Sequence, residues 1–260
     1  MMILKRFAGA GLLLAATAGS AEAKGYIVTL GARVATAPPY EGSDVYVFRP
    51  FPTLSLRPAS SPYRFSPPDG GTTFALIDNQ HFTFGPMARF RYKRKSTGDL
   101  TGFRELKWAA EPGVFVNIWP TDWLRLRGEA RHGVAGHHGF VGDTGVDLVY
   151  TGQKWNFSLG GRAGWGDSKY INEYFGVTAQ DAARSPLINR TYMPGGGRRY
   201  AGLEFAAAYN LDRHWQIKGD LGYRRLAEKA GDSPIVAIAG SRDQYLSSLG
   251  ISYSFGVGTR

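Results

Sequence analysis

The sequence lacks cysteine altogether, and this absence excludes disulfide bonds as a source of stability. The folded state must therefore be held by side-chain packing and by backbone hydrogen bonds. Beyond residue 23 the sequence also lacks any unbroken apolar run approaching the ~18 residues that a membrane-spanning helix requires. We therefore expect no spanning helix after the N-terminal segment.

Acidic residues are scarce relative to basic ones, 21 against 31, which leaves a net charge of +10. Such a balance can indicate nucleic-acid binding, but the N-terminus argues against it. Basic Lys5 and Arg6, an apolar run over 7–18 and the small-x-small site 21–23 are typical of a secretory signal peptide. An uncleaved anchor is disfavoured because the run is too short to span. We expect residues 1–23 to be removed and residues 24–260 to form one exported domain without a nucleic-acid partner.

The chain does contain many stretches in which apolar residues alternate with polar or small ones. This period of two is the period of a β-strand. In 244–255, the residues Tyr245, Ile251 and Tyr253 share one face, and the opposite face is mostly serine and glycine. Pro50 and Pro52 each remove a backbone donor, so we expect their strand to be interrupted or bulged. The pattern predicts strands at 26–34, 46–57, 63–66, 72–77, 82–92, 106–118, 124–131, 143–150, 155–165, 202–210, 215–224 and 244–255.

Charged residues occupy one face of nearly every predicted strand, and large apolar residues occupy the other. A two-sheet sandwich could bury the apolar faces, but two further features favour a membrane barrel. Trp and Tyr gather near the strand ends, and the connections alternate between short turns and long loops. The predicted fold is all-β: a closed, antiparallel, up-and-down transmembrane β-barrel of twelve strands. Ten strands is the alternative, if 63–66 and 72–77 lie outside the wall.

Several stretches outside the strands resemble one known family. The motifs are Pro39-Tyr40-Glu41-Gly42-Ser43-Asp44, Gly136-His137-His138-Gly139, Tyr174-Phe175-Gly176-Val177-Thr178, Ala182-Ala183-Arg184-Ser185-Pro186-Leu187 and Asp232-Ser233-Pro234-Ile235-Val236. Their order across the mature chain is similar to that of the MipA/OmpV family. The sequence departs from many such barrels because Phe255 is followed by five further residues, which we expect to form a short periplasmic tail.

The resemblance implies a bacterial outer-membrane barrel in contact with lipid. It also implies a non-enzymatic scaffold that links a lytic transglycosylase to a murein synthase in cell-wall maintenance. Other members of the family are surface proteins tied to osmotic or antibiotic response, or to adhesion. The alternative function is a small-solute channel that favours anions.

The charged face of the predicted strands is expected to line the lumen. Rings of arginine would favour anions in an open pore, whereas paired charges would fill a closed one. The pairing of charges is the favoured interpretation because acidic partners are at hand. The lumen residues are Arg89, Arg91, Arg125, Arg127, Arg131, Arg162, Lys218, Arg224, Glu111, Glu129, Asp143, Asp147, Glu204 and Asp220.

Two long loops carry the remaining candidates. The 166–199 loop is too long for a neutral connection, and Tyr174 and Phe175 could pack it into the lumen as a plug or present it as a lid or docking surface. Asp232, Ser233 and Pro234 in a later loop could cap that plug. His132, His137 and His138 near Asp143 raise the question of metal or catalytic chemistry, but no nucleophile accompanies them. We therefore expect no catalytic residue, metal or cofactor.

Overall fold

The computed structural model describes residues 25–258 except 62, 66 and 68–69. The predicted signal peptide lies outside the described residues. Within them, none of the helices is both long and apolar enough to cross a membrane. The strands are β1 (Tyr26–Ala37), β2 (Val47–Pro58), β3 (Thr72–Thr73), β4 (Ile77–Asp78), β5 (Phe82–Arg91), β6 (Ala109–Thr121), β7 (Leu124–His132), β8 (Phe140–Thr151), β9 (Trp155–Gly166), β10 (Gly197–Asn210), β11 (Trp215–Leu226) and β12 (Asp243–Val257). The helices are α1 (Ser168–Phe175), α2 (Ala179–Arg184), α3 (Glu228–Gly231), α4 (Pro234–Ala237) and the short 3-10 helix η1 (Gly98–Leu100).

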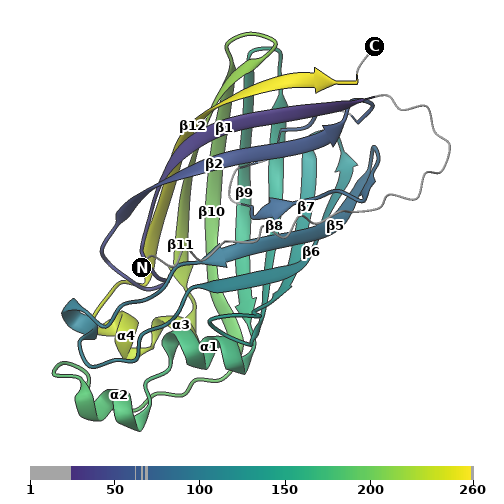
Figure 1. Cartoon of the computed structure of the whole chain (residues 1–260). Helices are drawn as coiled ribbons and strands as arrows, with labels where there is room; N and C mark the ends of the chain where they lie inside the picture. The colour runs from purple at the N-terminus through teal and green to yellow at the C-terminus, as the bar shows by residue number, and fades with distance from the viewer. Residues whose placement is uncertain (1–24, 62, 66, 68–69, 259–260) are drawn as a thin grey trace, which may run out of the picture.

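One antiparallel sheet of twelve strands curls into a barrel, as the sequence predicts (Figure 1). The strand predicted at 72–77 is present as two short strands, β3 and β4. Consecutive strands pair from β1 to β2 and from β4 to β12, and β12 returns to pair with β1 over the register Tyr26↔Val257 to Thr36↔Ser247. Short turns join the strands at one end of the barrel. The helices gather at the other end, where the long loops lie (Figure 1). We call these the short-turn end and the long-loop end.

The outer surface of the barrel is apolar along its whole height. Leu249, Leu221 and Leu203, in the middle of three neighbouring strands, are all more than half exposed. Aromatic side chains form a band at each end of this surface. Trp155, Tyr150, Trp215 and Tyr253 lie toward the short turns, and Phe90, Trp108, Phe140, Trp165 and Tyr245 lie toward the long loops. Two aromatic bands around an apolar belt are typical of a barrel surrounded by lipid.

Strand β2 forms one edge of the sheet, and its prolines explain why. Ala59 donates its N–H to Gly25 at 3.1 Å, so the odd-numbered positions of this strand turn their donors toward β1. Pro50, Pro52 and Pro58 are even-numbered, and their missing N–H groups face the free edge. The expected interruption or bulge is therefore wrong: β2 runs unbroken, because prolines on a free edge cost no ladder hydrogen bond.

The other edge of the sheet is made of β3 and β4. These two short strands follow one another along β5, and each pairs with it in antiparallel orientation. Among the described residues, no ladder joins either of them to β2. Side chains approach across the long-loop part of this seam: the Arg49 guanidinium lies 3.8 Å from the ring centroid of Tyr92. The predicted strand at 63–66 is not formed in its described part, 63–65, because this segment leaves the wall and enters the barrel.

Candidate functional site in the barrel lumen

The ion network of the lumen is organised around Arg131, which lies near the long-loop end of β7 and is almost fully buried. Its Nε donates to Glu111 of β6 at 3.0 Å, and its two Nη atoms donate to Glu129 and Asp143. Because an isolated charge in such a place would be very costly, each of these groups depends on the others. One guanidinium therefore joins three neighbouring strands from the inside.

Arginines outnumber carboxylates throughout this network. Glu129 is shared by Arg131, by Arg127 and, at 3.0 Å, by Arg89. Asp147 is shared by Arg125 at 2.6 Å and Arg162 at 2.8 Å. Including the pairs formed by Arg91 and Arg199, seven arginines share the five carboxylates Glu41, Glu111, Glu129, Asp143 and Asp147.

The remaining predicted lumen residues lie on β10 and β11. Glu204 is buried, and Asp220 accepts a hydrogen bond from the Ser248 hydroxyl. The Arg224 guanidinium lies 4.7 Å from the ring centroid of Tyr200, and the Lys218 ammonium lies 5.1 Å from that of Phe65. The structure thus gathers the predicted charged residues into one interior.

The sequence interpretation misses Arg199, because it places residues 166–199 in a loop. Strand β10 begins earlier, at Gly197, and its register against β9 shifts between Arg198 and Tyr200. A β-bulge of this kind puts two adjacent side chains on one face. Arg199 and Tyr200 are consequently both buried, and both bond Asp143, through Nη2 at 2.5 Å and through the hydroxyl at 2.8 Å.

The long loops and helices fold over the lumen as a cap, which we define as residues 38–46, 92–108, 133–139, 167–196 and 227–242. Helix α1 lies over the lumen, and Tyr170, Tyr174 and Phe175 are buried in one cluster with wall residues Val141 and Leu226. Asp167 begins this helix by accepting a hydrogen bond from the Tyr170 N–H at 2.8 Å. Two of the predicted plug residues, Tyr174 and Phe175, therefore pack into the cap.

The loop 227–242, which follows β11, holds α1 in place. The Ser233 hydroxyl donates to the Phe175 carbonyl at 2.6 Å and accepts from the Ile235 N–H at 3.2 Å, which also starts α4. Pro234 is buried at the first turn of that helix, where its missing donor is not needed. Asp232 points outward and pairs with Arg242 on the exposed surface. Of the three capping candidates, Ser233 and Pro234 are buried in the cap.

Glu41 links the cap to the lumen network, and the sequence interpretation did not single it out. Its carboxylate pairs with Arg91 at 3.1 Å and with Arg199, and it accepts the Tyr170 hydroxyl at 3.1 Å. Burial alone would raise the pKa of Glu41, but the two guanidiniums outweigh burial and lower its pKa to about 2.

The next residue, Gly42, allows Glu41 to turn inward. Its backbone has a φ of +99°, and an added Cβ would lie 2.6 Å from Val236. Only glycine fits both the conformation and the space at this position. The loop 38–46 is thereby held against α4.

The short-turn end is closed by a different segment, the mouth segment, which we define as the described residues of 59–71. Phe65 is fully buried inside the barrel against Trp119, Val149, Ala206 and Ala208. Arg57 donates to the Ser61 carbonyl at 2.8 Å, Arg64 to the Asn79 carbonyl at 3.2 Å, and Gln216 to the Tyr63 hydroxyl at 2.8 Å. These bonds reach β2, the β4–β5 turn and β11, so the segment crosses the mouth of the barrel.

The three histidines have different surroundings. His137 is buried and its Nε2 lies 3.0 Å from Glu111, while His132 packs on the Phe140 ring and His138 is exposed. Asp143 is bonded instead by Arg131, Arg199 and Tyr200. In the described part of the chain, no group of three or more His, Asp or Glu side chains is placed to hold a metal ion.

An apolar exterior with two aromatic bands and an ionic interior define an integral outer-membrane β-barrel. In this class the short turns face the periplasm and the long loops face outward, which orients the mouth segment and the cap. Residues 30–255 match the sequence profile of the family described as MltA-interacting protein MipA. The chain therefore belongs to the MipA family and resides in the bacterial outer membrane.

Comparison with solved structures finds other barrels at low identity. The CymD monoaromatic hydrocarbon channel is 10% identical, with 90% of this chain and 89% of that one covered and a TM-score of 0.39. The Ralstonia pickettii toluene transporter TbuX is 9% identical, with 90% of each chain covered and a TM-score of 0.36. The N-terminal barrel domain of Pseudomonas aeruginosa OprF is 13% identical, with 68% and 98% covered and a TM-score of 0.31. At these TM-scores no function is transferred, and no curated relative matches the chain.

The mouth segment yields a prediction for Phe65. We expect Phe65→Ala to destabilise the folded barrel by about 3–5 kcal/mol, because it empties a fully buried site. Phe48→Ala is the matched control, since Phe48 is 78% exposed on the outer face. Urea unfolding in lipid vesicles, followed by tryptophan fluorescence, measures both variants. Equal stability of the two would contradict the placement of Phe65 inside the barrel.

The lowered pKa of Glu41 predicts an acid-sensitive cap. A carboxylate whose folded pKa is depressed from 4.5 to about 2 stabilises the fold above pH 4.5 and loses that contribution as the pH falls toward 2. The contribution amounts to about 3 kcal/mol. Relative to the intrinsic exchange rate at each pH, which itself changes with acidity, hydrogen exchange of α1 should accelerate over this pH range in the wild type. In Glu41→Gln it should be faster at neutral pH and change less with acid; an unaltered pH profile would refute the role of Glu41.

Proposed function

We propose that this protein is a non-enzymatic scaffold that binds a lytic transglycosylase and a murein synthase at its periplasmic end. The observation that carries the proposal is the filled lumen, with ion pairs through its middle, the cap above and Phe65 below. A barrel arranged in this way is suited to binding at its ends more than to conducting through its centre. The family description, MltA-interacting protein, supplies the class of partner.

The periplasmic end offers a larger surface than the short turns alone would provide. Stable interfaces bury about 800 Å² on each partner, and turns of a few residues contribute little of this. The mouth segment adds Tyr63, which is 45% exposed and accepts a hydrogen bond from Gln216 of β11, and two of the short turns carry Trp123 and Arg213. Tyr, Trp and Arg are the side chains that most often dominate binding energy. We assign the docking surface to these three residues and their neighbours.

The test is binding of purified lytic transglycosylase and murein synthase to the barrel in lipid nanodiscs. We expect Trp123→Ala combined with Arg213→Ala to weaken binding by about tenfold or more. The control carries Leu187→Ala and Met193→Ala, two exposed residues of the cap, and should bind normally. If the wild type binds neither enzyme, or if both variants bind equally well, the proposed docking surface is refuted.

The alternative, an anion-favouring channel, draws on the excess of lumen arginines over carboxylates. Against it stand Phe65, the cap and the sharing of each carboxylate by two or three arginines. Anion-selective conductance steps of the wild type in planar bilayers would support the channel. Silence would support the scaffold.

A further inference from the structure

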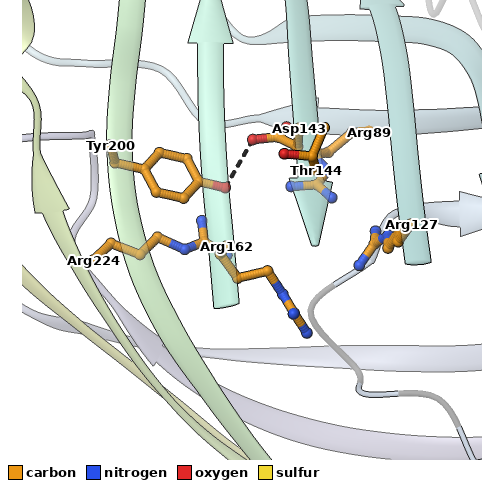
Figure 2. A pocket seen from close by; sticks show the side chains of 7 residues that line it. All are labelled: Arg89, Arg127, Asp143, Thr144, Arg162, Tyr200 and Arg224. Carbon is orange, nitrogen blue, oxygen red and sulfur yellow. Dashed lines mark hydrogen bonds between the residues drawn. The ribbon is translucent and has the colours of Figure 1, made fainter. Parts of the chain in front are cut away.

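Charged groups inside the barrel lie among polar and aromatic partners. Figure 2 shows Tyr200 with Asp143 and Arg224: its hydroxyl donates to Asp143 at 2.8 Å, and its ring centroid lies 4.7 Å from the Arg224 guanidinium. Two lysines on the outside of the molecule, Lys93 and Lys107, have surroundings of another kind. Both are exposed, and within the described residues neither forms an ion pair. Their charges are therefore available to a partner outside the chain.

The two exposed lysines lie opposite each other in the connection between β5 and β6, just beyond the barrel wall. The ladder of these strands ends at Arg91↔Ala109, and the bridge Arg94↔Leu106 continues it in the same register. The two lysines between these pairs are therefore cross-strand neighbours. Like charges placed directly opposite on a sheet repel each other, so this arrangement is unfavourable until an anion lies between them.

Both lysines face away from the interior of the cap. Arg94 and Leu106 point into the cap, where Arg94 donates to the Tyr174 carbonyl at 2.7 Å and Leu106 packs in one cluster with α1. Because successive side chains point to opposite sides of a strand, the residues next to this buried pair face outward. One position beyond the pair, Lys95 lies opposite Glu105, and these two charges offset each other. The surplus of positive charge on the outer side therefore falls on the two lysines.

The position of the lysines along the barrel matches the headgroups of the outer leaflet. Trp108, which is 59% exposed and belongs to the aromatic band at the long-loop end, directly follows Lys107. Tyr92, which is 46% exposed, directly precedes Lys93. Exposed aromatic side chains of this kind lie at the level of lipid headgroups in membrane proteins. The ammonium groups therefore lie at the boundary where the charged part of a lipid is found.

We propose that Lys93 and Lys107 together bind a phosphate group of lipopolysaccharide, the phosphorylated glycolipid of the outer leaflet. An ammonium group forms charge-assisted hydrogen bonds with phosphate oxygens, and a phosphate placed between the two lysines removes their repulsion. The acyl chains of the same lipid lie against the apolar outer face, where Phe90 is 66% exposed. The lipid thus holds the outside of a connection whose inside holds α1. This site does not depend on the proposed scaffold function.

The test is native mass spectrometry of the purified chain in non-ionic detergent, titrated with lipid A that carries both of its phosphates. We expect the wild type to bind lipid A without phosphates about tenfold or more weakly. Lys93→Gln/Lys107→Gln should lose about the same factor for the phosphorylated lipid, and Lys93→Arg/Lys107→Arg should retain its binding. The matched control, Lys154→Gln/Arg213→Gln, removes two positive charges from exposed short turns at the opposite end and should bind as the wild type does.

Equal affinity of the wild type for the two lipids would overturn the proposal, and this comparison requires no variant. Equal affinity of the wild type and the glutamine variant for the phosphorylated lipid would also overturn it. An equal loss in the short-turn control would show that overall charge, and not the lysine pair, attracts the lipid. Inorganic phosphate at the concentration of the lipid should leave the complex intact; displacement would assign the lysines to a free ion and refute the lipid site. Heat-dependent mobility on gels verifies that each variant is folded.

Discussion

The structure depends on one constraint: charges placed inside an apolar shell must find partners there. Arg131, Glu111, Glu129 and Asp143 meet this constraint by bonding across three strands, so the interior itself fixes how the strands sit side by side. Breaking such a buried pair from one side costs about 3–5 kcal/mol, more than an ordinary surface contact can offset. In a chain without cysteine, this network takes part of the role that disulfides have in other exported proteins.

The same constraint explains how the two ends are closed. At the long-loop end Glu41 descends from a loop to pair with Arg91 and Arg199, so the cap is fixed to the wall by charge as well as by the packing of α1. The other end is closed by apolar contact, with Phe65 inserted among Trp119, Val149 and two alanines. The two closures therefore rest on different interactions, ion pairs at the long-loop end and apolar contact at the short-turn end.

The sequence predicts the structure well where apolar and polar residues alternate, and poorly where they do not. The two faces of β12, and the wall as a whole, were predictable because alternation is enforced by lipid on one side and charge on the other. Arg199 was missed because a bulge breaks the alternation at that point. Glu41 was missed because loops carry no period. The segment around Phe65 alternates as a strand does, and only its neighbours in space show that it enters the barrel. The prolines of β2 predicted an interrupted or bulged strand. Whether a proline interrupts a strand depends on whether its missing N–H group faces a neighbouring strand or a free edge, and the sequence alone does not show this.

The central claim, a filled and covered lumen, is most directly tested by thiol accessibility, because the chain contains no cysteine to interfere. Ser158→Cys places a thiol on the inner face of β9, where the side chain is 2% exposed. Ser60→Cys places one on the exposed mouth segment. With a charged methanethiosulfonate reagent, the account predicts that Ser158→Cys reacts at least about a hundredfold more slowly, since it must wait for local opening. Equal rates at the two positions would mean an open, water-filled lumen and would contradict the account.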